Sequence, residues 1–248
     1  MAGKNKDFIA GRHPVLEALE SGLAIDSIWM SRGSSGPAET RIREQCRDRR
    51  IPVKLVPVQA LSRIWTGNHQ GVIAWRSAVP FYRIADLVPA IYEKGETPLF
   101  VMLDGVTDVR NAGAIARSAL AAGAHGLIIG TRDIARFNEE AVKASAGALL
   151  HLPVCREALP FAIDLLRQSG VQVIGAALEK SEVPSALDLT LPTCLLMGAE
   201  GTGIDPELFK VLDHRVRIPQ SDQVDSFNVS VAAGILLYEA MRQRGSFL

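Results

Sequence analysis

Residues 99–244 alternate between short apolar segments and segments with helical spacing, and this alternation limits the possible folds more than any other feature. The apolar segments include PLFVMLDGV, HGLIIG, VQVIGAAL and TCLLM, and helix-like or glycine-rich stretches separate them. Strands that alternate with helices in this way form a parallel sheet covered on both faces. The sequence therefore predicts an α/β fold with a parallel sheet in this part of the chain.

The chain before this region forms a second, smaller α/β pattern. The segments HPVLEALESG and AETRIREQCRDRR have helical character, whereas AIDSIWMS, IPVKLVP and GVIAWRSA read as strands. A change of pattern at Pro80 marks the boundary. We predict a small domain at residues 1–80, a connector or first helix at 81–98, and a larger domain at 99–248.

The charge balance does not by itself indicate a nucleic-acid partner, because 27 basic residues match 27 acidic ones. Charge can still be distributed unevenly over the surface. The stretch Arg41–Arg50 holds five arginines against two acidic residues. Two interpretations of it stay open, a solvated helix face and a surface that faces RNA.

The cysteines indicate neither a disulfide framework nor a metal site. Cys46, Cys155 and Cys194 are odd in number, far apart and without zinc-ligand spacing. The N-terminal segment lacks the apolar core of a signal peptide, and no apolar run has the length of a membrane span. We therefore expect reduced thiols, no metal, no membrane association and a cytoplasmic location.

Three loops follow apolar strands, at the sheet edge where α/β proteins bind ligands. In the first, Asn111 lies at the turn into a helix and Arg117 follows six residues later. A guanidinium here can hold an anion such as a phosphate. The alternative is that Asn111 only caps the helix and Arg117 is a surface charge.

The second and third loops have different chemistry. The second, LLMGAEGTGID, lets a ligand approach the backbone closely, but Glu200 between Gly198 and Gly201 disfavours a phosphate. The alternative is an ordinary loop with an exposed acid. In the third, Ser226 is expected to cap a helix that begins near Asn228, and the small residues that follow suit close packing against a backbone or a cofactor.

In combination and order, the three loops resemble the signature motifs of a known family. Asn-x-Gly-x-x-x-Arg, Gly-x-Glu-Gly-x-Gly and Ile-Pro…Ser-x-Asn-Val-Ser are similar to the motifs of the SpoU (TrmH) RNA ribose 2′-O-methyltransferases, of the SPOUT class. This resemblance covers roughly residues 99–244. IAGRHPVLEAL and HQGVIA resemble the ribosomal-protein-like substrate-binding domain of the subgroup that methylates a guanosine in 23S ribosomal RNA.

The resemblance implies a deep trefoil knot, S-adenosylmethionine as methyl donor, a ribosomal RNA partner and a homodimer. It carries cofactor contacts over to Gly198, Ile218 and Phe227. The matched catalytic positions are Asn111, Arg117, Glu200, Ser226 and Asn228.

The family motifs also imply a role for each catalytic residue. An arginine is a demanding base, since its pKa lies far above neutral pH. We therefore expect Arg117 to clamp an RNA phosphate first and to assist deprotonation second. Asn111 and Glu200 are expected to hold Arg117 and the ribose, while Ser226 and Asn228 fix the loop and the nucleotide.

Some positions depart from the family pattern or concern the small domain. Asp222 stands where the family usually has glycine, Phe227 where it has leucine, and Val109 where proline is common. In the small domain, Arg12 and His13 are candidates for RNA contact, with a purely structural role as the alternative. Gln70 is expected to close a turn rather than to read a base.

Three functions are compatible with these observations. The first is methylation of ribosomal RNA, which the separate small domain favours. The second is 2′-O-methylation of tRNA, because relatives with that activity share all three motifs. The third is a non-catalytic RNA-binding protein, which the presence of both Asn111 and Arg117 disfavours.

Overall fold

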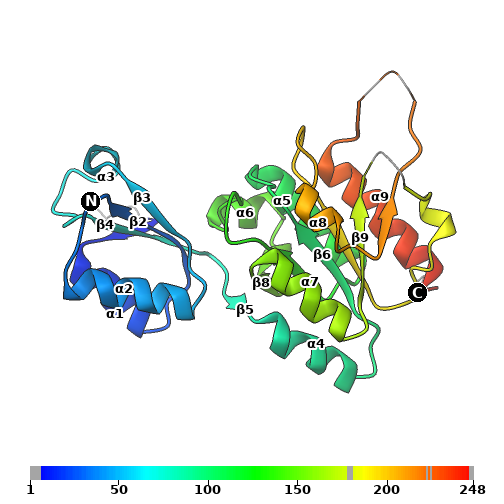
Figure 1. The fold of residues 1–248 in the computed structure, drawn as a ribbon, viewed down its shortest axis with the longest axis horizontal. Coiled ribbons are helices and arrows are strands. Elements are labelled where there is room, and N and C mark those ends of the chain that lie inside the picture. The colour runs from blue at the N-terminus through cyan, green and yellow to red at the C-terminus, as the bar shows by residue number, and fades with distance from the viewer. Residues whose placement is uncertain (1–6, 178–180, 222, 224, 246–248) are drawn as a thin grey trace. The chain divides into compact units, whose positions relative to one another are not determined.

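The computed structural model describes residues 7–177, 181–221, 223 and 225–245 of the 248-residue chain. It divides into two compact units (Figure 1). Unit 1 consists of Met1–Pro80 together with Arg136–Asn138. Unit 2 consists of Phe81–Ala135 and Glu139–Leu248, so the segment 81–98 belongs to the second unit.

Unit 1 is a small sheet with two helices against one face. Its elements are β1 (Phe8–Ala10), α1 (Arg12–Glu20), β2 (Ile25–Ser31), α2 (Pro37–Asp48), β3 (Val53–Val56), α3 (Val58–Ile64) and β4 (Val72–Arg76). Among the described residues the strand order is β1-β4-β2-β3, with β2 parallel to β3 and antiparallel to β4. Val15, Ile28, Met30 and Val72 belong to the apolar cluster between the sheet and α1 and α2.

Arg12, a candidate for RNA contact, has structural partners in unit 1. Its Nη2 lies 2.6 Å from Oε1 of Glu39, a side chain that is only 2 % exposed. Arg12 also donates from its backbone N–H to Gln70 Oε1 and from Nε to Gln70 O. Gln70 has a φ of 48° at its turn, in line with its expected role there. His13 is exposed, so its side chain remains accessible.

Removing the Arg12 side chain is expected to destabilise unit 1, because it leaves the Glu39 carboxylate buried without this partner. We expect Arg12→Ala to cost about 2 kcal/mol, less than a fully buried pair, since 40 % of the Arg12 side chain is exposed. Urea unfolding followed by tryptophan fluorescence measures this, because Trp29, Trp65 and Trp75 all lie in unit 1.

Arg41→Ala is the matched control for this measurement. Arg41 forms an equally short pair with Glu20, but both side chains are well exposed. Such pairs contribute about 0–1 kcal/mol. Equal unfolding midpoints for the two variants would show that burial of Glu39 does not make the Arg12 pair important.

Unit 2 contains the parallel sheet that the alternation predicted. Its strands are β5 (Phe81–Tyr82), β6 (Leu99–Leu103), β7 (Gly126–Ile129), β8 (Val154–Arg156), β9 (Gln172–Ala176), β10 (Thr193–Met197) and β11 (His214–Val216). Among the described residues they lie in the order β11-β9-β10-β6-β7-β8-β5, and each neighbouring pair is parallel. The prediction of a parallel sheet is therefore confirmed.

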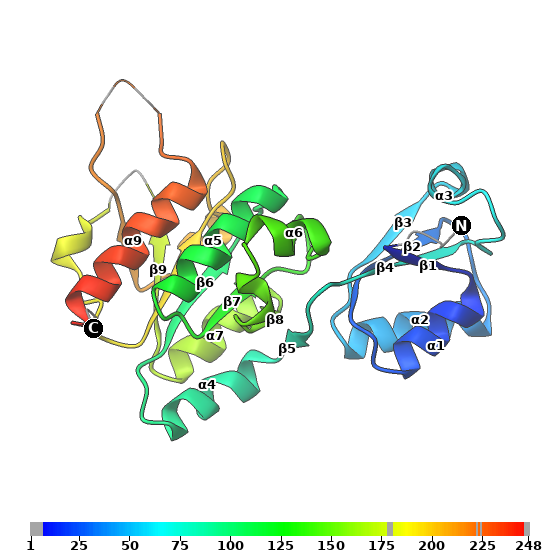
Figure 2. The same ribbon diagram turned by 180° about the vertical axis from the view of Figure 1, so that it is seen from behind.

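Helices cover both faces of this sheet (Figures 1 and 2). Those of unit 2 are α4 (Ile84–Glu93), α5 (Val109–Ala121), α6 (Glu139–Ala144), α7 (Leu159–Gln168), α8 (Pro206–Phe209) and α9 (Val229–Gln243), with 3₁₀ turns η1 (Ala148–Leu150) and η2 (Pro184–Ala186). Apolar residues of α4, α7 and α8 share one core cluster with the sheet. On the other face α5 packs against α6 and α9, which brings two of the three motif-bearing segments together.

The structure differs from the sequence prediction where elements are short or interrupted. β1, β5 and β8 have only two or three residues and give too weak a pattern to be recognised. The apolar spacing of EEAVKASAGALLHLP predicts a single helix, but α6 ends at Ala144. Ala146 and Gly147 take positive φ values of 49° and 85°, which an α-helix cannot accommodate.

The cysteines behave as expected. Cys46, Cys155 and Cys194 are buried free thiols. Burial raises the pKa of Cys46 and of Cys155 to about 12, so both stay protonated at neutral pH. Within the described residues, no cluster of His, Cys, Asp and Glu is suited to hold a metal ion. No helix in the described ranges combines the length and apolarity needed to cross a membrane.

Candidate active site

Three of the motif residues form one hydrogen-bonded cluster. Asn111 Nδ2 donates to Glu200 Oε1 at 3.2 Å. Asn228 Nδ2 donates to Asn111 Oδ1 at 3.1 Å and to Glu200 Oε1 at 2.5 Å. These residues come from the start of α5, from the loop after β10 and from the start of α9, so the cluster joins three segments that are distant in sequence.

The helix caps explain why these side chains are available. Asp108, not Asn111, caps α5, because its Oδ1 accepts from the Arg110 N–H at 2.7 Å. The alternative interpretation of Asn111 as a helix cap is therefore wrong. At α9 the predicted cap was Ser226, and this is also wrong. Asn228 is the cap, since its Oδ1 accepts from the Ser230 N–H at 2.9 Å while its Nδ2 joins the cluster.

Arg117 lies apart from this cluster. It is exposed on α5 and, among the described residues, makes no hydrogen bond or ion pair. Six residues turn an α-helix by about 240° beyond one full turn, so Arg117 and Asn111 occupy different sides of α5. Asn111 and Glu200 do not hold Arg117 in this chain, and its guanidinium is free to meet an external anion.

A cavity of about 740 Å³ lies beside the cluster, at the carboxyl ends of β9, β10 and β11. It is lined by Gly198, Ile218 and Phe227, the three predicted cofactor contacts, and also by Glu200 and Ser226. Asn111, Arg117 and Asn228 are not part of this lining. Glu200 therefore belongs both to the cavity wall and to the polar cluster.

The glycine loop after β10 has a fixed shape. Ala199 and Gly203 exchange two backbone hydrogen bonds of 2.9–3.0 Å, which close residues 199–203 into a tight turn. A Cβ at Gly198 would lie 2.3 Å from the Gly203 carbonyl carbon and 2.4 Å from the Ile204 nitrogen. Glycine at position 198 is thus required by the close approach of two backbone segments.

Gly113 in the first motif has a packing role. A Cβ there would lie 2.6 Å from Ala144 Cβ and 2.9 Å from the Ser145 nitrogen. The glycine lets α5 approach the end of α6 closely. The packing of α5 against the end of α6 therefore helps to position the first loop, in addition to the hydrogen bonds of the loop itself.

Asp104 is a site residue that the sequence analysis missed. It follows β6 directly, and its Oδ2 accepts from the Asp205 N–H at 2.7 Å. Its backbone N–H donates to Met197 O. The pKa of Asp104 is raised, mainly by burial, and the hydrogen bond from the Asp205 N–H offsets only part of this rise. The position directly after an apolar strand, at the sheet edge where ligands bind, was the available signal.

Asp104 is expected to hold the far end of the glycine loop in place. Asp104→Ala removes the acceptor for the Asp205 N–H, and we expect S-adenosylmethionine to bind about tenfold more weakly, as a lost hydrogen bond to a charged group implies. Asp104→Asn keeps an acceptor oxygen and serves as the control. Calorimetric titration measures both, and equal affinity of the alanine variant and the unaltered protein would contradict this role.

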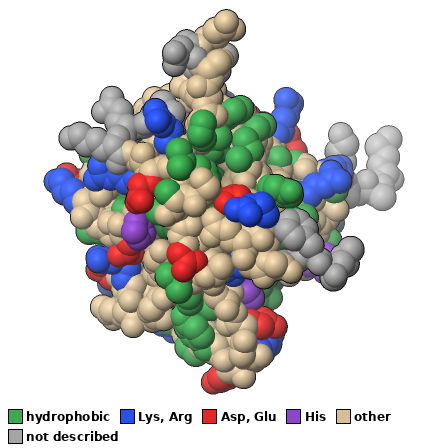
Figure 3. Space-filling view, turned by 90° about the vertical axis from the view of Figure 1, so that its right-hand side faces the viewer, with side chains coloured by type: hydrophobic (Ala, Val, Ile, Leu, Met, Phe, Trp, Pro, Cys, Tyr) green, Lys and Arg blue, Asp and Glu red, His purple; other side chains and the backbone are tan. Residues whose placement is uncertain are grey.

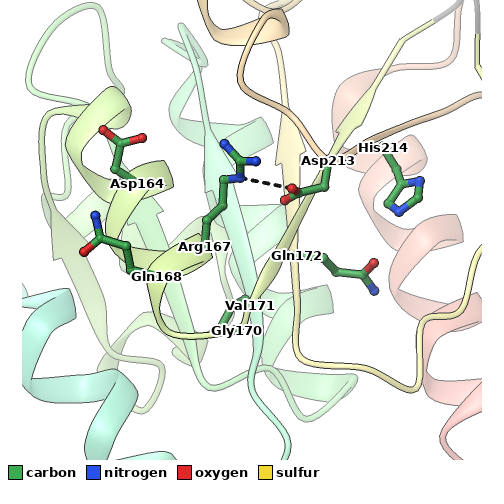
Figure 4. A pocket seen from close by; sticks show the side chains of 8 residues that line it. All are labelled: Asp164, Arg167, Gln168, Gly170, Val171, Gln172, Asp213 and His214. Atoms are coloured by element: carbon green, nitrogen blue, oxygen red, sulfur yellow. Dashed lines mark hydrogen bonds and ion pairs between the residues drawn. The ribbon is translucent and has the colours of Figure 1, made fainter.

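A second hollow lies at the opposite edge of the sheet, where β9 and β11 begin (Figure 4). Two of its charged side chains, Arg167 and Asp213, pair with each other. Arg167 Nε donates to Asp213 Oδ1 at 3.0 Å, and Asp213 Oδ2 accepts from the Val173 N–H at 2.8 Å. It contains none of the motif residues. We interpret this hollow as a structural junction between α7 and β11.

The three residues that differ from the usual family pattern lie in different parts of unit 2. Val109 begins α5 directly after its Asp108 cap, a position that proline and valine both tolerate. Phe227 is 36 % exposed and lines the cavity. Asp222 lies outside the described residues.

Comparison with known proteins places the chain in a family. Residues 98–238 match the SpoU rRNA Methylase family, and residues 8–80 match the RNA 2′-O ribose methyltransferase substrate-binding family. A putative TrmH family tRNA/rRNA methyltransferase, YacO of Bacillus subtilis, is 34 % identical over 96 % of both chains. The chain therefore belongs to the SpoU methyltransferase family.

Two further relatives are more specific. The 23S rRNA (guanosine-2′-O-)-methyltransferase RlmB of Yersinia pestis is 38 % identical over 76 % of this chain and 79 % of its own length. The solved structure of an AdoMet-bound rRNA methyltransferase from Sinorhizobium meliloti is 30 % identical, with a TM-score of 0.62 over 97 % of this chain and 87 % of that one. This structure confirms the SPOUT fold class.

The cavity fits the cofactor of this family. Glu200 and Asp225 place carboxylates in a partly apolar lining, which favours a ligand with cationic groups and disfavours a polyphosphate. The guanidinium of Arg215 is already engaged, because it donates to Phe209 O and lies over the Phe209 ring. The protein is an S-adenosylmethionine-dependent RNA 2′-O-methyltransferase.

Proposed function

We propose that this protein methylates the ribose 2′-hydroxyl of a guanosine in 23S ribosomal RNA. The observation that carries the proposal is the cluster of Asn111, Glu200 and Asn228 at the wall of the cavity. The choice of ribosomal RNA is supported by the RlmB relative and by the separate substrate-binding domain at residues 8–80. Because its substrate is made there, we place the protein in the cytoplasm.

Each side chain of the site has a role in this proposal. S-adenosylmethionine bound here would supply an electrophilic methyl group, and its sulfonium sulfur would be left as a neutral thioether. Gly198, Ile218 and Phe227 line the cofactor cavity. Asn111 and Glu200 orient the ribose, while Asn228 ties both to the start of α9. Ser226, also in the cavity wall, contacts the nucleotide.

Arg117 holds the RNA on the outside of this cluster. Its exposed guanidinium pairs with a phosphate next to the target ribose, and the 2′-hydroxyl proton leaves toward that phosphate as the oxygen–carbon bond forms. Alignment of the hydroxyl with the methyl group supplies much of the acceleration.

We also propose a homodimer and a knotted chain. On α9, Val231 is 49 % and Tyr238 57 % exposed, although α5 already packs against this helix. Figure 3 looks onto the side of the molecule that carries α9, and hydrophobic side chains are grouped there. A second copy covering this side would bring a partner close to Arg117 on α5. The trefoil knot follows from the family resemblance.

A tRNA substrate is the second candidate, favoured by the YacO relative, whose name covers both RNA classes.

Purified protein should transfer a labelled methyl group to 23S ribosomal RNA taken from cells that lack this protein, and not to the tRNA of those cells. Mapping 2′-O-methylation in these cells should show one ribosomal guanosine losing its mark. Loss of a tRNA mark with intact ribosomal RNA would refute the ribosomal substrate.

A further inference from the structure

The sheet of unit 1 has one face that its two long helices do not cover. Side chains alternate between the faces of a strand, so Ile28 and Met30 point toward α1 and α2 while Trp29 points away. In the same way, Val72 and Ala74 of β4 point toward α1 and α2, while Trp75 points to the opposite face. The opposite face is covered only in part, by the two-turn helix α3 (Figures 1 and 2).

Aromatic rings from separate strands gather on this partly covered face. Phe8 of β1 lies 5.6 Å from Trp75 of β4, and Trp75 lies 5.8 Å from Trp29 of β2, both edge to face. Trp65, just after α3, lies 6.1 Å from Phe8. All four rings are partly buried. They include the three tryptophans of the whole chain.

Two cations lie over these rings. Lys54 Nζ is 5.1 Å from the centre of the Trp29 ring, and the guanidinium carbon of Arg136 is 3.8 Å from that of Trp75. Arg136 belongs to unit 1 together with Asn138 and Phe137. Asp7 and Asp26 are the acidic groups near Arg136, and Asp26 already accepts from the Phe137 N–H.

Aromatic rings interleaved with cations fit one kind of partner well. Single-stranded RNA presents base faces that stack on aromatic side chains, and phosphates that pair with Lys and Arg. A four-stranded sheet with helices on one face and aromatic rings on the other is a known geometry for such stacking. An apolar protein partner, by contrast, would have to desolvate the ammonium group of Lys54.

We propose that the face formed by Phe8, Trp29, Lys54, Trp65, Trp75 and Arg136 binds an unpaired segment of the substrate RNA by base stacking. This proposal rests on the proposed function as an RNA methyltransferase and deepens it. It assigns RNA binding to this aromatic face and not to the arginine-rich helix α2 on the other side of the sheet. The arginines of α2 are then a solvated helix face.

The tryptophans provide a direct readout in the intact chain. Their fluorescence reports on this face alone, because unit 2 contains no tryptophan. A single-stranded oligoribonucleotide of about 12 nucleotides should quench the fluorescence strongly, and a fully paired RNA of equal length should do so weakly. S-adenosylmethionine alone should leave the signal unchanged, since its cavity lies in unit 2.

Two exposed cations on opposite sides of the sheet distinguish the two candidate surfaces. Lys54→Glu should weaken binding of the oligoribonucleotide about tenfold, and Trp29→Leu should do so by a similar factor. Arg47→Glu on α2 makes the same kind of charge reversal at another exposed residue and should leave the affinity within about twofold. Lys54 is at the surface, so its replacement is compatible with folding.

The outcomes separate this inference from the proposed function. If the unaltered protein methylates ribosomal RNA, but RNA does not quench the tryptophans and Lys54→Glu binds normally, the stacking face is refuted and the enzyme stands. If Arg47→Glu alone weakens binding, RNA lies on α2. If no ribosomal RNA is methylated by the unaltered protein, the proposed function itself fails.

Discussion

Replacing Arg117 with alanine is expected to lower kcat for RNA methylation by a factor of about a hundred or more, with little change in the Kd for S-adenosylmethionine. The reason is that Arg117 is exposed, lies outside the cofactor cavity and, among the described residues, has no partner whose loss would disturb the fold. Single-turnover methyl transfer and calorimetric titration of the cofactor measure the two quantities separately.

Two further variants sharpen this test. Arg117→Lys keeps the positive charge but loses the planar fork that binds a phosphate through two hydrogen bonds, so it should recover only part of the rate. Arg83→Ala removes another exposed arginine, at the start of α4, and should leave the rate unaltered. An equal loss of rate and of cofactor affinity in Arg117→Ala would show that its assigned role is wrong.

The sheet and the helices were predictable from sequence wherever the pattern was long and regular. β6, β9 and β10 each give five successive residues, and α5 and α9 each run for more than twelve, so their periodicity stands out. The order of strands was not predictable. Placing β10 between β9 and β6 depends on contacts between segments that are far apart in the chain.

The candidate site was predictable as a set of residues but not as an arrangement. The motifs named Asn111, Glu200 and Asn228, and their residue types are those that hydrogen-bond side by side. Which polar residue caps a helix depends on where the helix begins, and a shift of two or three residues moved the caps to Asp108 and Asn228. Because Asp108 caps α5, the amide of Asn111 can hydrogen-bond to Glu200 and Asn228.

The placement of Arg117 shows the limit of spacing arguments. Its six-residue separation from Asn111 suggested a guanidinium reaching back to the loop, whereas helical geometry turns it to another side of α5. The motif therefore encodes two surfaces, the wall of the cavity and an exposed side of the helix. The exposed position of Arg117 agrees with its proposed pairing with an RNA phosphate.

Replacing Gly198 with alanine is expected to have the other large effect. The added Cβ would lie 2.3–2.6 Å from three backbone atoms of Gly203 and Ile204, which cannot move aside as a flexible side chain does. The hydrogen bonds between Ala199 and Gly203 must then break or shift, and the cavity wall moves with them. We expect S-adenosylmethionine to bind about a hundredfold more weakly and the Tm of unit 2 to fall, as overpacking of a tight contact implies.

Gly201→Ala is the matched control, because this glycine lies in the same loop and also lines the cavity. Its φ of 87° makes alanine unfavourable, but no atom lies within 4 Å of the added Cβ. The backbone strain costs about 1 kcal/mol, so the affinity should fall less than about tenfold. Calorimetric titration and thermal unfolding of both variants compare the two effects. Equal losses would mean that loop strain, and not the contact between two backbone segments at Gly198, sets the shape of the cofactor site.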